Sequence, residues 1–438
     1  MAQFRKDTHQ YLGDGKTIFE VMMLADQYGN LVGPANPSGM AVDAFGRSRV
    51  SQPYTLYDSV HRYQDNGKEN LANTAGATSA FNSNTASIDL VVDTVSGHYA
   101  YRESKKVFAY QPGKSLQILK TFVMNSHKTN LRQRVGYFTS DNGFFLERSD
   151  ATASKVSFVK RSSVSGSVVD TPVDQSNWNI DKLDGTGPSL LTLNLDNPQI
   201  LFTDIEWLGV GSVRMGFVIN GQFIHCHTFH HANIDTAVKG AYIQTACLPI
   251  RSEIENVGTT ASQSTYKQIC ATVISEGGYS LTGKPRTQAT TMTPGIRLTT
   301  AGTYYPVMSI RLNTDNLGGL VIPHAMSLLP LNSGNYHYKI NVGGTVAGAT
   351  WANASSNSIV QYNSNTTATM SGGIDLFSGH ISSTVQAGGS ITLSGENLFK
   401  YQLERNTFTG STTPLTLLVT SDTGTVNVSA SMSWEEVT

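Results

Sequence analysis

The sequence contains few cysteines, and this shortage already excludes one class of protein. Three occur in 438 residues, at Cys226, Cys247 and Cys270. An odd and sparse set is too small for a disulfide scaffold. It suits a protein that is made and assembled in a reducing cytoplasm.

Charged side chains are scarce as well. Asp, Glu, Lys and Arg make up 14% of the chain, against about 25% in an average soluble domain. The formal net charge is −1. The densest basic groups, Arg102/Lys105/Lys106 and Arg132/Arg134, are expected to be solvated strand or loop residues. Because binding to phosphates needs a stripe of basic side chains, we expect no nucleic-acid partner.

Long hydrophobic runs are missing too. Residues 1–10 are polar, and residues 18–25 form a short apolar segment that Glu20 interrupts. Nothing approaches the roughly 20 apolar residues of a membrane span, and no secretion signal is visible. We therefore expect no membrane insertion.

Glycine and short polar side chains are abundant instead. The chain has 40 glycines, and turn sequences such as Asp141-Asn142-Gly143 and Asn220-Gly221 separate short alternating segments. Asn-Gly accepts positive φ at both positions and so suits a tight hairpin turn. Many short strands without a helical period predict an all-β protein with two β-sandwich, jelly-roll-like domains.

The predicted strands fall into two groups. Residues 51–280 are expected to form the first β-sandwich and residues 301–438 the second. Residues 281–300 are rich in Thr and Pro with little apolar content, which predicts a linker. Residues 1–50 combine a short ordered segment with a series of Gly and Pro breakers, which is typical of an attachment arm. The alternative is an N-terminal strand that pairs with the first domain.

A histidine cluster follows the Asn220-Gly221 turn. Strict alternation along residues 222–229 would place His225 and His227 on one strand face, with His230 and His231 just past its end. Such a set can converge on Zn²⁺ or Fe²⁺, which makes these four residues candidate metal ligands. The alternative is a packed, hydrogen-bonded group, because spacing alone is a weak motif.

Two further features suggest surface chemistry. Asp204 and Glu206 alternate on one strand beside Trp207, and a glycosidase needs two carboxylates about 5–9 Å apart. Aromatic residues, Tyr401 among them, are frequent in the second domain, where Trp351 is the candidate for an exposed, sugar-stacking contact. No nucleotide-binding, zinc-protease or serine-hydrolase motif is present, so we expect a protein without enzymatic activity.

Long segments of the chain resemble a known family. They are YRESKKVFAYQPGKSLQILKTFVMN (101–125), LRQRVGYFTSDNGFFLERS (131–149), SNWNIDKLDGTGPS (176–189), DIEWLGVGSVRMGFVINGQFIHCHTFHHAN (204–233) and TACLPIRSEIENVGTTASQSTYKQICATVISEGGY (245–279). Together they resemble virion structural proteins of tailed bacteriophages, especially the marine, cyanophage-like ones. The resemblance covers roughly residues 40–435.

The resemblance implies a building block of a virus particle, assembled in the host cytoplasm and released by lysis. We expect a tail- or baseplate-associated fibre or adhesin. It would dock on other virion proteins through residues 1–50, form a homo-oligomer (a trimer is favoured) and contact host-surface glycan. One alternative is a capsid-decorating or collar/neck fibre protein, and a second is a polysaccharide-degrading tailspike.

Overall fold

The computed structural model describes residues 52–149, 155–234, 239–280, 282–364, 369–384 and 401–437, together with short strands outside these ranges. The chain divides into two compact units, residues 1–52 and 53–438. Four strands of the first unit form two pairs, β1 (His9–Tyr11) with β2 (Ile18–Glu20) and β3 (Leu24–Ala25) with β4 (Leu31–Val32). The rest of the predicted attachment arm, 1–50, lies outside the described residues.

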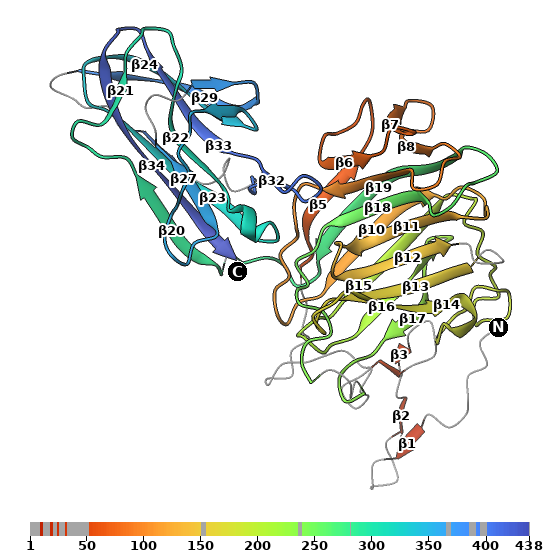
Figure 1. Cartoon of the computed structure of the whole chain (residues 1–438). Coiled ribbons are helices and arrows are strands. Elements are labelled where there is room, and N and C mark those ends of the chain that lie inside the picture. Colours follow the sequence, from red (N-terminus) through yellow and green to blue (C-terminus); the bar gives the residue numbers. More distant parts are fainter. Residues whose placement is uncertain are drawn as a thin grey trace. The chain divides into compact units, whose positions relative to one another are not determined.

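The first part of the second unit is a sandwich of two antiparallel sheets (Figure 1). The eight-stranded sheet has the order β17 (Gln222–Phe229), β16 (Val213–Ile219), β15 (Gln199–Ile205), β10 (Leu116–Val123), β19 (Ser264–Ser275), β8 (Ser87–Val92) and β7 (Ala77–Asn82), and β5 (Tyr54–Val60) pairs with β19. The seven-stranded sheet has the order β14 (Val169–Asp174), β13 (Lys155–Ser162), β12 (Gly143–Ser149), β11 (Leu131–Phe138), β18 (Ile250–Asn256), β9 (Tyr99–Ser104) and β6 (Glu69–Asn73).

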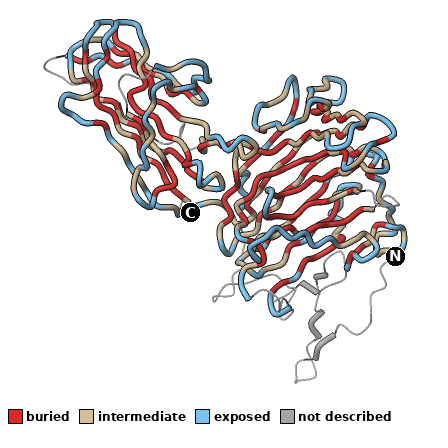
Figure 2. Tube along the Cα trace, viewed as in Figure 1, coloured by how far each residue is buried: buried red, intermediate tan, exposed pale blue. Residues whose placement is uncertain are grey.

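The two sheets enclose one apolar core. Along β10 buried and partly exposed residues alternate without a break, as expected of a strand with one face on the core. Ile118 of β10 and Val135 of β11 belong to the same buried cluster, so side chains from both sheets meet there. Figure 2 shows buried residues along the strands and exposed ones mostly in the loops.

The second sandwich follows the same plan. Its five-stranded sheet has the order β20 (Lys284–Ala289), β34 (Val426–Val437), β23 (Leu320–Pro330) and β30 (Ile391–Ser394), and β21 (Ile296–Leu298) pairs with β34. Its six-stranded sheet has the order β26 (Ala352–Asn353), β27 (Val360–Asn363), β22 (Tyr305–Leu312), β33 (Leu415–Ser421), β24 (Gly334–Val342) and β29 (Ile374–Ser383). Two small two-stranded sheets complete it, β25 (Thr345–Ala347) with β28 (Thr369–Ser371) and β31 (Arg405–Asn406) with β32 (Ser411–Thr412).

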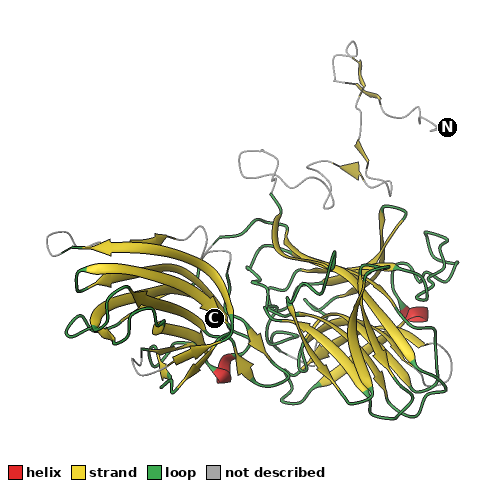
Figure 3. Cartoon of the chain, turned by 90° about the horizontal axis from the view of Figure 1, so that it is seen from above, coloured by secondary structure: helices red, strands yellow, loops and turns green. Residues whose placement is uncertain are grey.

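The all-β prediction is therefore confirmed. The described helical turns are two 3-10 segments, η1 (Gln175–Asn177) and η2 (Thr314–Asn316), and strands dominate the view in Figure 3. The predicted hairpin turn at Asn220-Gly221 has positive φ at both residues, 52° and 76°, and joins β16 to β17. In the described part of the chain, no helix has the length and apolar character needed to span a membrane.

The segment 281–300 was expected to be a linker, but much of it forms strands of the second sandwich. It contains β20 and β21, and both pair with the last strand, β34. β20 lies at the end of its sheet, and its side chains are exposed or half-buried, so main-chain hydrogen bonds hold it without an apolar face. A polar edge strand of this kind carries no hydrophobic alternation that a sequence could reveal.

The two sandwiches are joined by a small apolar cluster and a buried charge. Val107 and Ala109, which follow β9, pack with Leu320 and Ile322 of β23. Arg405, at the start of β31, is almost fully buried. Its guanidinium lies 3.2 Å from Glu103 Oε1 of β9 and also donates to the carbonyl oxygens of Ser104 and Leu317.

A second buried charge lies inside the first sandwich. Lys120 points inward from β10, and its Nζ donates to Ser252 Oγ (2.6 Å) and to the Arg251 carbonyl oxygen (3.2 Å). Burial penalises the charged ammonium and lowers the pKa of Lys120 from 10.5 to about 8.

This shift predicts a pH-dependent stability. Between pH 8 and 10.5 the unfolded chain binds more protons at Lys120 than the folded chain, so the free energy of unfolding should rise with pH across this interval. The rise is on the order of 3 kcal/mol for a shift of this size. Denaturant titrations at pH 7.5 and 10.5 should show it in the wild type and not in Lys120→Met. An equal rise in both proteins would contradict the assignment.

Removing the buried charge between the sandwiches should uncouple them. Breaking a buried ion pair costs about 3–5 kcal/mol, so calorimetry of Arg405→Met should show two separate transitions where the wild type shows one. Arg297→Met is the matched control, because Arg297 lies exposed on β21. A single, unshifted transition in Arg405→Met would show that the apolar contact suffices.

Candidate functional site

The histidine cluster is dispersed by a β-bulge. In the pairing of β16 with β17, His225 lies opposite Gly216 and His227 opposite Met215, so Cys226 is an extra residue. His225 therefore packs beside Phe202 on the outer side of the sheet. His227 is buried edge-on against Phe229, with ring centroids 4.5 Å apart. The prediction that both share one strand face is wrong, because strict alternation does not hold across a bulge.

The other two histidines have partners of their own. His230 is exposed and its Nδ1 lies 3.0 Å from Ser212 Oγ. His231 is buried, stacks on Tyr242 and hydrogen-bonds the Gly211 carbonyl oxygen (2.9 Å). Among the described residues, no three His, Cys, Asp or Glu side chains are grouped as a metal site requires. The structure thus does not bring together the predicted ligand set for Zn²⁺ or Fe²⁺.

The two candidate carboxylates lie in different surroundings. Asp204 lies within β15, whereas Glu206 follows the end of this strand and is exposed. Burial raises the pKa of Asp204 to about 6, although Arg214 Nη2 lies 3.4 Å from its carboxylate. Asp204 is therefore a partly buried strand residue, whereas Glu206 is an exposed residue beyond the end of that strand.

A dense ion-pair network covers the outer face of the seven-stranded sheet. Arg134 bridges Glu147 (2.6 Å) and Glu253 (3.5 Å), and Arg251 bridges Glu253 (2.6 Å) and Glu103 (3.0 Å). Each of these carboxylates has a guanidinium partner. Such neutralised carboxylates are held in place and suit a structural role better than acid–base catalysis.

Trp351 lies in a polar patch of the second sandwich. Its ring is half-buried, and the Arg311 guanidinium covers one face at 4.2 Å from the ring centroid. Arg311 in turn donates to Gln361 Oε1 on β27 (2.9 and 3.1 Å). One face of the indole is thus occupied, and a role of Trp351 in surface binding stays a prediction.

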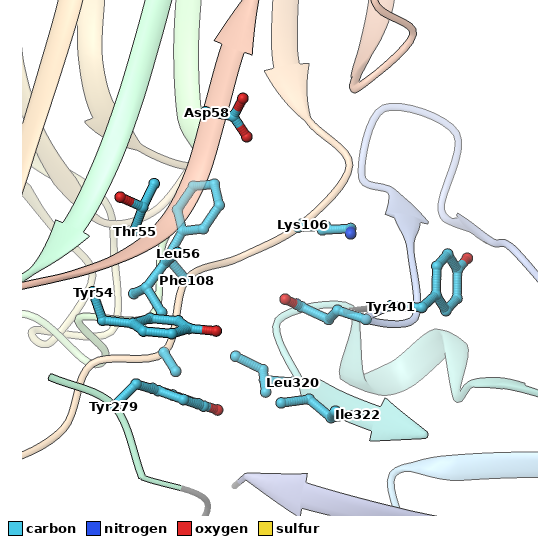
Figure 4. A pocket seen from close by; sticks show the side chains of 12 residues that line it. Tyr54, Thr55, Leu56, Asp58, Lys106, Phe108, Tyr279, Leu320, Ile322 and Tyr401 are labelled. Carbon is cyan, nitrogen blue, oxygen red and sulfur yellow. The ribbon is translucent and has the colours of Figure 1, made fainter. Parts of the chain in front are cut away.

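A cavity of about 360 Å³ lies where the two sandwiches meet, and we call it the tyrosine pocket. Its volume falls in the range of about 300–1,000 Å³ that small-molecule sites occupy. Its lining residues come from β5, from the segments that follow β9 and β19, from β23 and from the segment before β31 (Figure 4). They are Tyr54, Thr55, Leu56, Asp58, Lys106, Phe108, Ala109, Tyr279, Leu320, Ile322, Tyr401 and Gln402.

Strand pairing positions one wall of the pocket. β5 pairs with β19, and Tyr54 lies opposite Ser275, four residues before Tyr279. The two tyrosine rings stack with centroids 5.7 Å apart, and Figure 4 shows their hydroxyls directed toward the cavity. Burial, assisted by nearby Glu435, raises the pKa of Tyr279 to about 12, so its hydroxyl is a hydrogen-bond donor at neutral pH.

Lys106 faces this wall and forms no hydrogen bond with a described residue, whereas the Tyr401 hydroxyl points away from the cavity (Figure 4). The Tyr401 hydroxyl is buried and makes no hydrogen bond, and burial raises its pKa well above the usual value. Lys106 extends toward Tyr401, with Nζ 5.3 Å from the ring centroid (Figure 4). The half-buried Lys106 side chain thus brings an ammonium into the pocket lining, where a ligand can bind it.

The sequence did not point to this pocket. Lys106 belongs to the basic group that we expected to be solvated, but Lys106 is half-buried. Arg102 of the same group is buried and pairs with Asp65 (2.6 Å) and Glu69 (3.3 Å). Residues 54, 106, 279 and 401 are far apart in the chain, and no local pattern links them.

Comparison with known proteins bears on the fold alone. No protein-family model matches the sequence, and no curated protein matches it. Similar solved structures include the carbohydrate recognition domain of Emp47p (10% identity, 54% of this chain and 99% of that one, TM-score 0.33). They also include the CBM2 module of the evolved Dit of Lactobacillus casei BL23 phage J-1 (6%, 53% and 100%, 0.32) and a Bacillus licheniformis β-glucanase (11%, 50% and 96%, 0.31). These low values say nothing about what this chain binds.

Proposed function

We propose that this chain is a non-enzymatic structural component of a tailed-phage particle. In this proposal it is a tail- or baseplate-associated fibre or adhesin that binds a saccharide of the host surface in the tyrosine pocket. The virion assignment is supported by the sequence resemblance over roughly residues 40–435. The binding role is supported by the pocket, and above all by the Lys106 ammonium in its lining, which has no hydrogen-bond partner among the described residues.

The chemistry of the pocket suits a polyhydroxylated ligand. Tyr54 and Tyr279 supply hydroxyls and ring edges, while Leu320 and Ile322 supply an apolar surface. A sugar ring has the matching combination of hydroxyl groups around its rim and C–H groups on its faces. Pockets that join an apolar lining with a few convergent polar groups are typical binding sites.

Weak sites of this kind gain strength through repetition. A single saccharide in an open pocket forms few contacts, so one site alone would bind weakly. We propose a homotrimer that docks on the particle through residues 1–50, because linked sites raise the overall affinity by about 10²–10⁴ without new contacts.

The binding role is tested by Tyr279→Ala. Loss of this ring removes a pocket wall and the support of Tyr54, and should weaken binding to isolated host-surface polysaccharide roughly 10- to 100-fold by surface plasmon resonance. Tyr63→Ala is the matched control, because Tyr63 is 78% exposed and lies outside the pocket. Equal affinity of the two variants would overturn the pocket as the binding site.

The position on the particle is a separate question. Immunogold labelling of intact virions with an antibody against residues 301–438 should place gold at the tail tip or baseplate. Gold over the head or neck would instead support the alternative of a capsid-decorating or collar protein.

The tailspike alternative predicts polymer degradation. Asp204, with a pKa of about 6, is the observation that favours it, since a general acid needs a raised pKa. An enzyme would lower the viscosity of a host polysaccharide solution over time, whereas a binding protein would leave it unchanged. We expect no change.

A further inference from the structure

Lys106 carries the one charge in the pocket lining that lacks an ion-pair partner among the described residues. The lining contains a single carboxylate, that of Asp58, whose Oδ1 lies 3.2 Å from Lys68 Nζ. Glu404 lies close enough to favour the charged form of Lys106, but it forms no ion pair with it. The electrostatic balance of the pocket is therefore positive, and the excess charge is centred on Lys106.

The contact between Lys106 and Tyr401 does not use the hydrogen-bonding capacity of the ammonium. A cation over an aromatic ring gains about 0.5–1 kcal/mol at an accessible site. The three N–H donors of the ammonium remain to be paired, and no described residue accepts from Nζ. Several donors and one net positive charge favour an anion as the group that completes the site.

We propose that the saccharide bound in the tyrosine pocket is acidic, and that its carboxylate pairs with Lys106. This inference rests on the proposed saccharide-binding function and specifies its ligand class. The remainder of the sugar lies against the tyrosine hydroxyls and the apolar side chains of Leu320 and Ile322. A hexuronic acid has the required combination, because it adds one carboxylate to an otherwise neutral sugar ring.

The experiment compares two proteins with two ligands. The full chain and Lys106→Met are assayed on an immobilised array of uronate-containing polysaccharides and on the same polymers after chemical reduction of their carboxyl groups to alcohols. Charge-assisted hydrogen bonds contribute about 1.5–3 kcal/mol. Reduction should therefore weaken wild-type binding roughly 10- to 100-fold and leave Lys106→Met unaffected, with both proteins equally weak on the reduced polymer.

Two control variants separate charge from folding. Lys105→Met removes a neighbouring ammonium outside the pocket lining and should bind like the wild type. Lys106→Arg keeps the charge and should retain the preference for the acidic polymer. Thermal unfolding of all variants confirms that each is folded.

The outcomes distinguish this inference from the function on which it rests. If Tyr279→Ala abolishes binding while acidic and reduced polymers bind the wild type equally, saccharide binding stands and the role of Lys106 is refuted. If neither polymer binds the wild type, both proposals are overturned. A loss in Lys105→Met equal to that in Lys106→Met would also contradict the inference, because it would indicate a diffuse charge effect.

Discussion

The contact between the two sandwiches depends on the pairing of a buried guanidinium. Arg405 leaves the second sandwich on a short hairpin and meets Glu103 of the first. A buried charge is strongly unfavourable unless an opposite charge and hydrogen bonds compensate it. Here the Glu103 carboxylate and two carbonyl oxygens do so, and Asn70 Nδ2 donates to the Arg405 carbonyl oxygen (2.7 Å). Because these groups come from several segments, the pairing fixes how the hairpin lies.

The tyrosine pocket follows from this constraint. Tyr401 and Gln402 lie four and three residues before Arg405, so the buried pairing of Arg405 also restricts their positions. A hydrogen bond from Gln402 Nε2 to the Val107 carbonyl oxygen (3.0 Å) holds them beside the segment that carries Lys106. The opposite wall, Tyr54 and Tyr279, is set by strand pairing within the first sandwich. One wall is thus intrinsic to a sandwich, and the other exists because the sandwiches are joined. A ligand that touches both walls would stabilise the joined state, since it binds only when both are in place.

The sequence predicts those features that depend on neighbouring residues. Apolar and polar residues alternate along β34, whose Val426, Val428 and Trp434 are buried, and the predicted Asn220-Gly221 turn forms a hairpin. Alternation of side chains gives the wrong prediction at the β-bulge, where the extra residue places His225 and His227 on different faces. It also gives no signal for β20, because main-chain hydrogen bonds hold this edge strand without an apolar face. The tyrosine pocket could not be predicted, because its walls come from segments up to about 350 residues apart whose contact depends on tertiary pairing.

The few charged residues of this chain are distributed in a way that bears on the tyrosine pocket. A chain with 14% charged residues would be expected to place them on its surface. Instead, Arg102, Arg134, Arg251 and Arg405 lie buried, each paired with a carboxylate. Lys106, by contrast, lies in the wall of a cavity without a carboxylate partner among the described residues. Its side chain is half-buried, and its ammonium lies over the Tyr401 ring. In the proposed complex an acidic ligand completes this site, because it supplies the negative charge and the hydrogen-bond acceptors that Lys106 lacks in the protein.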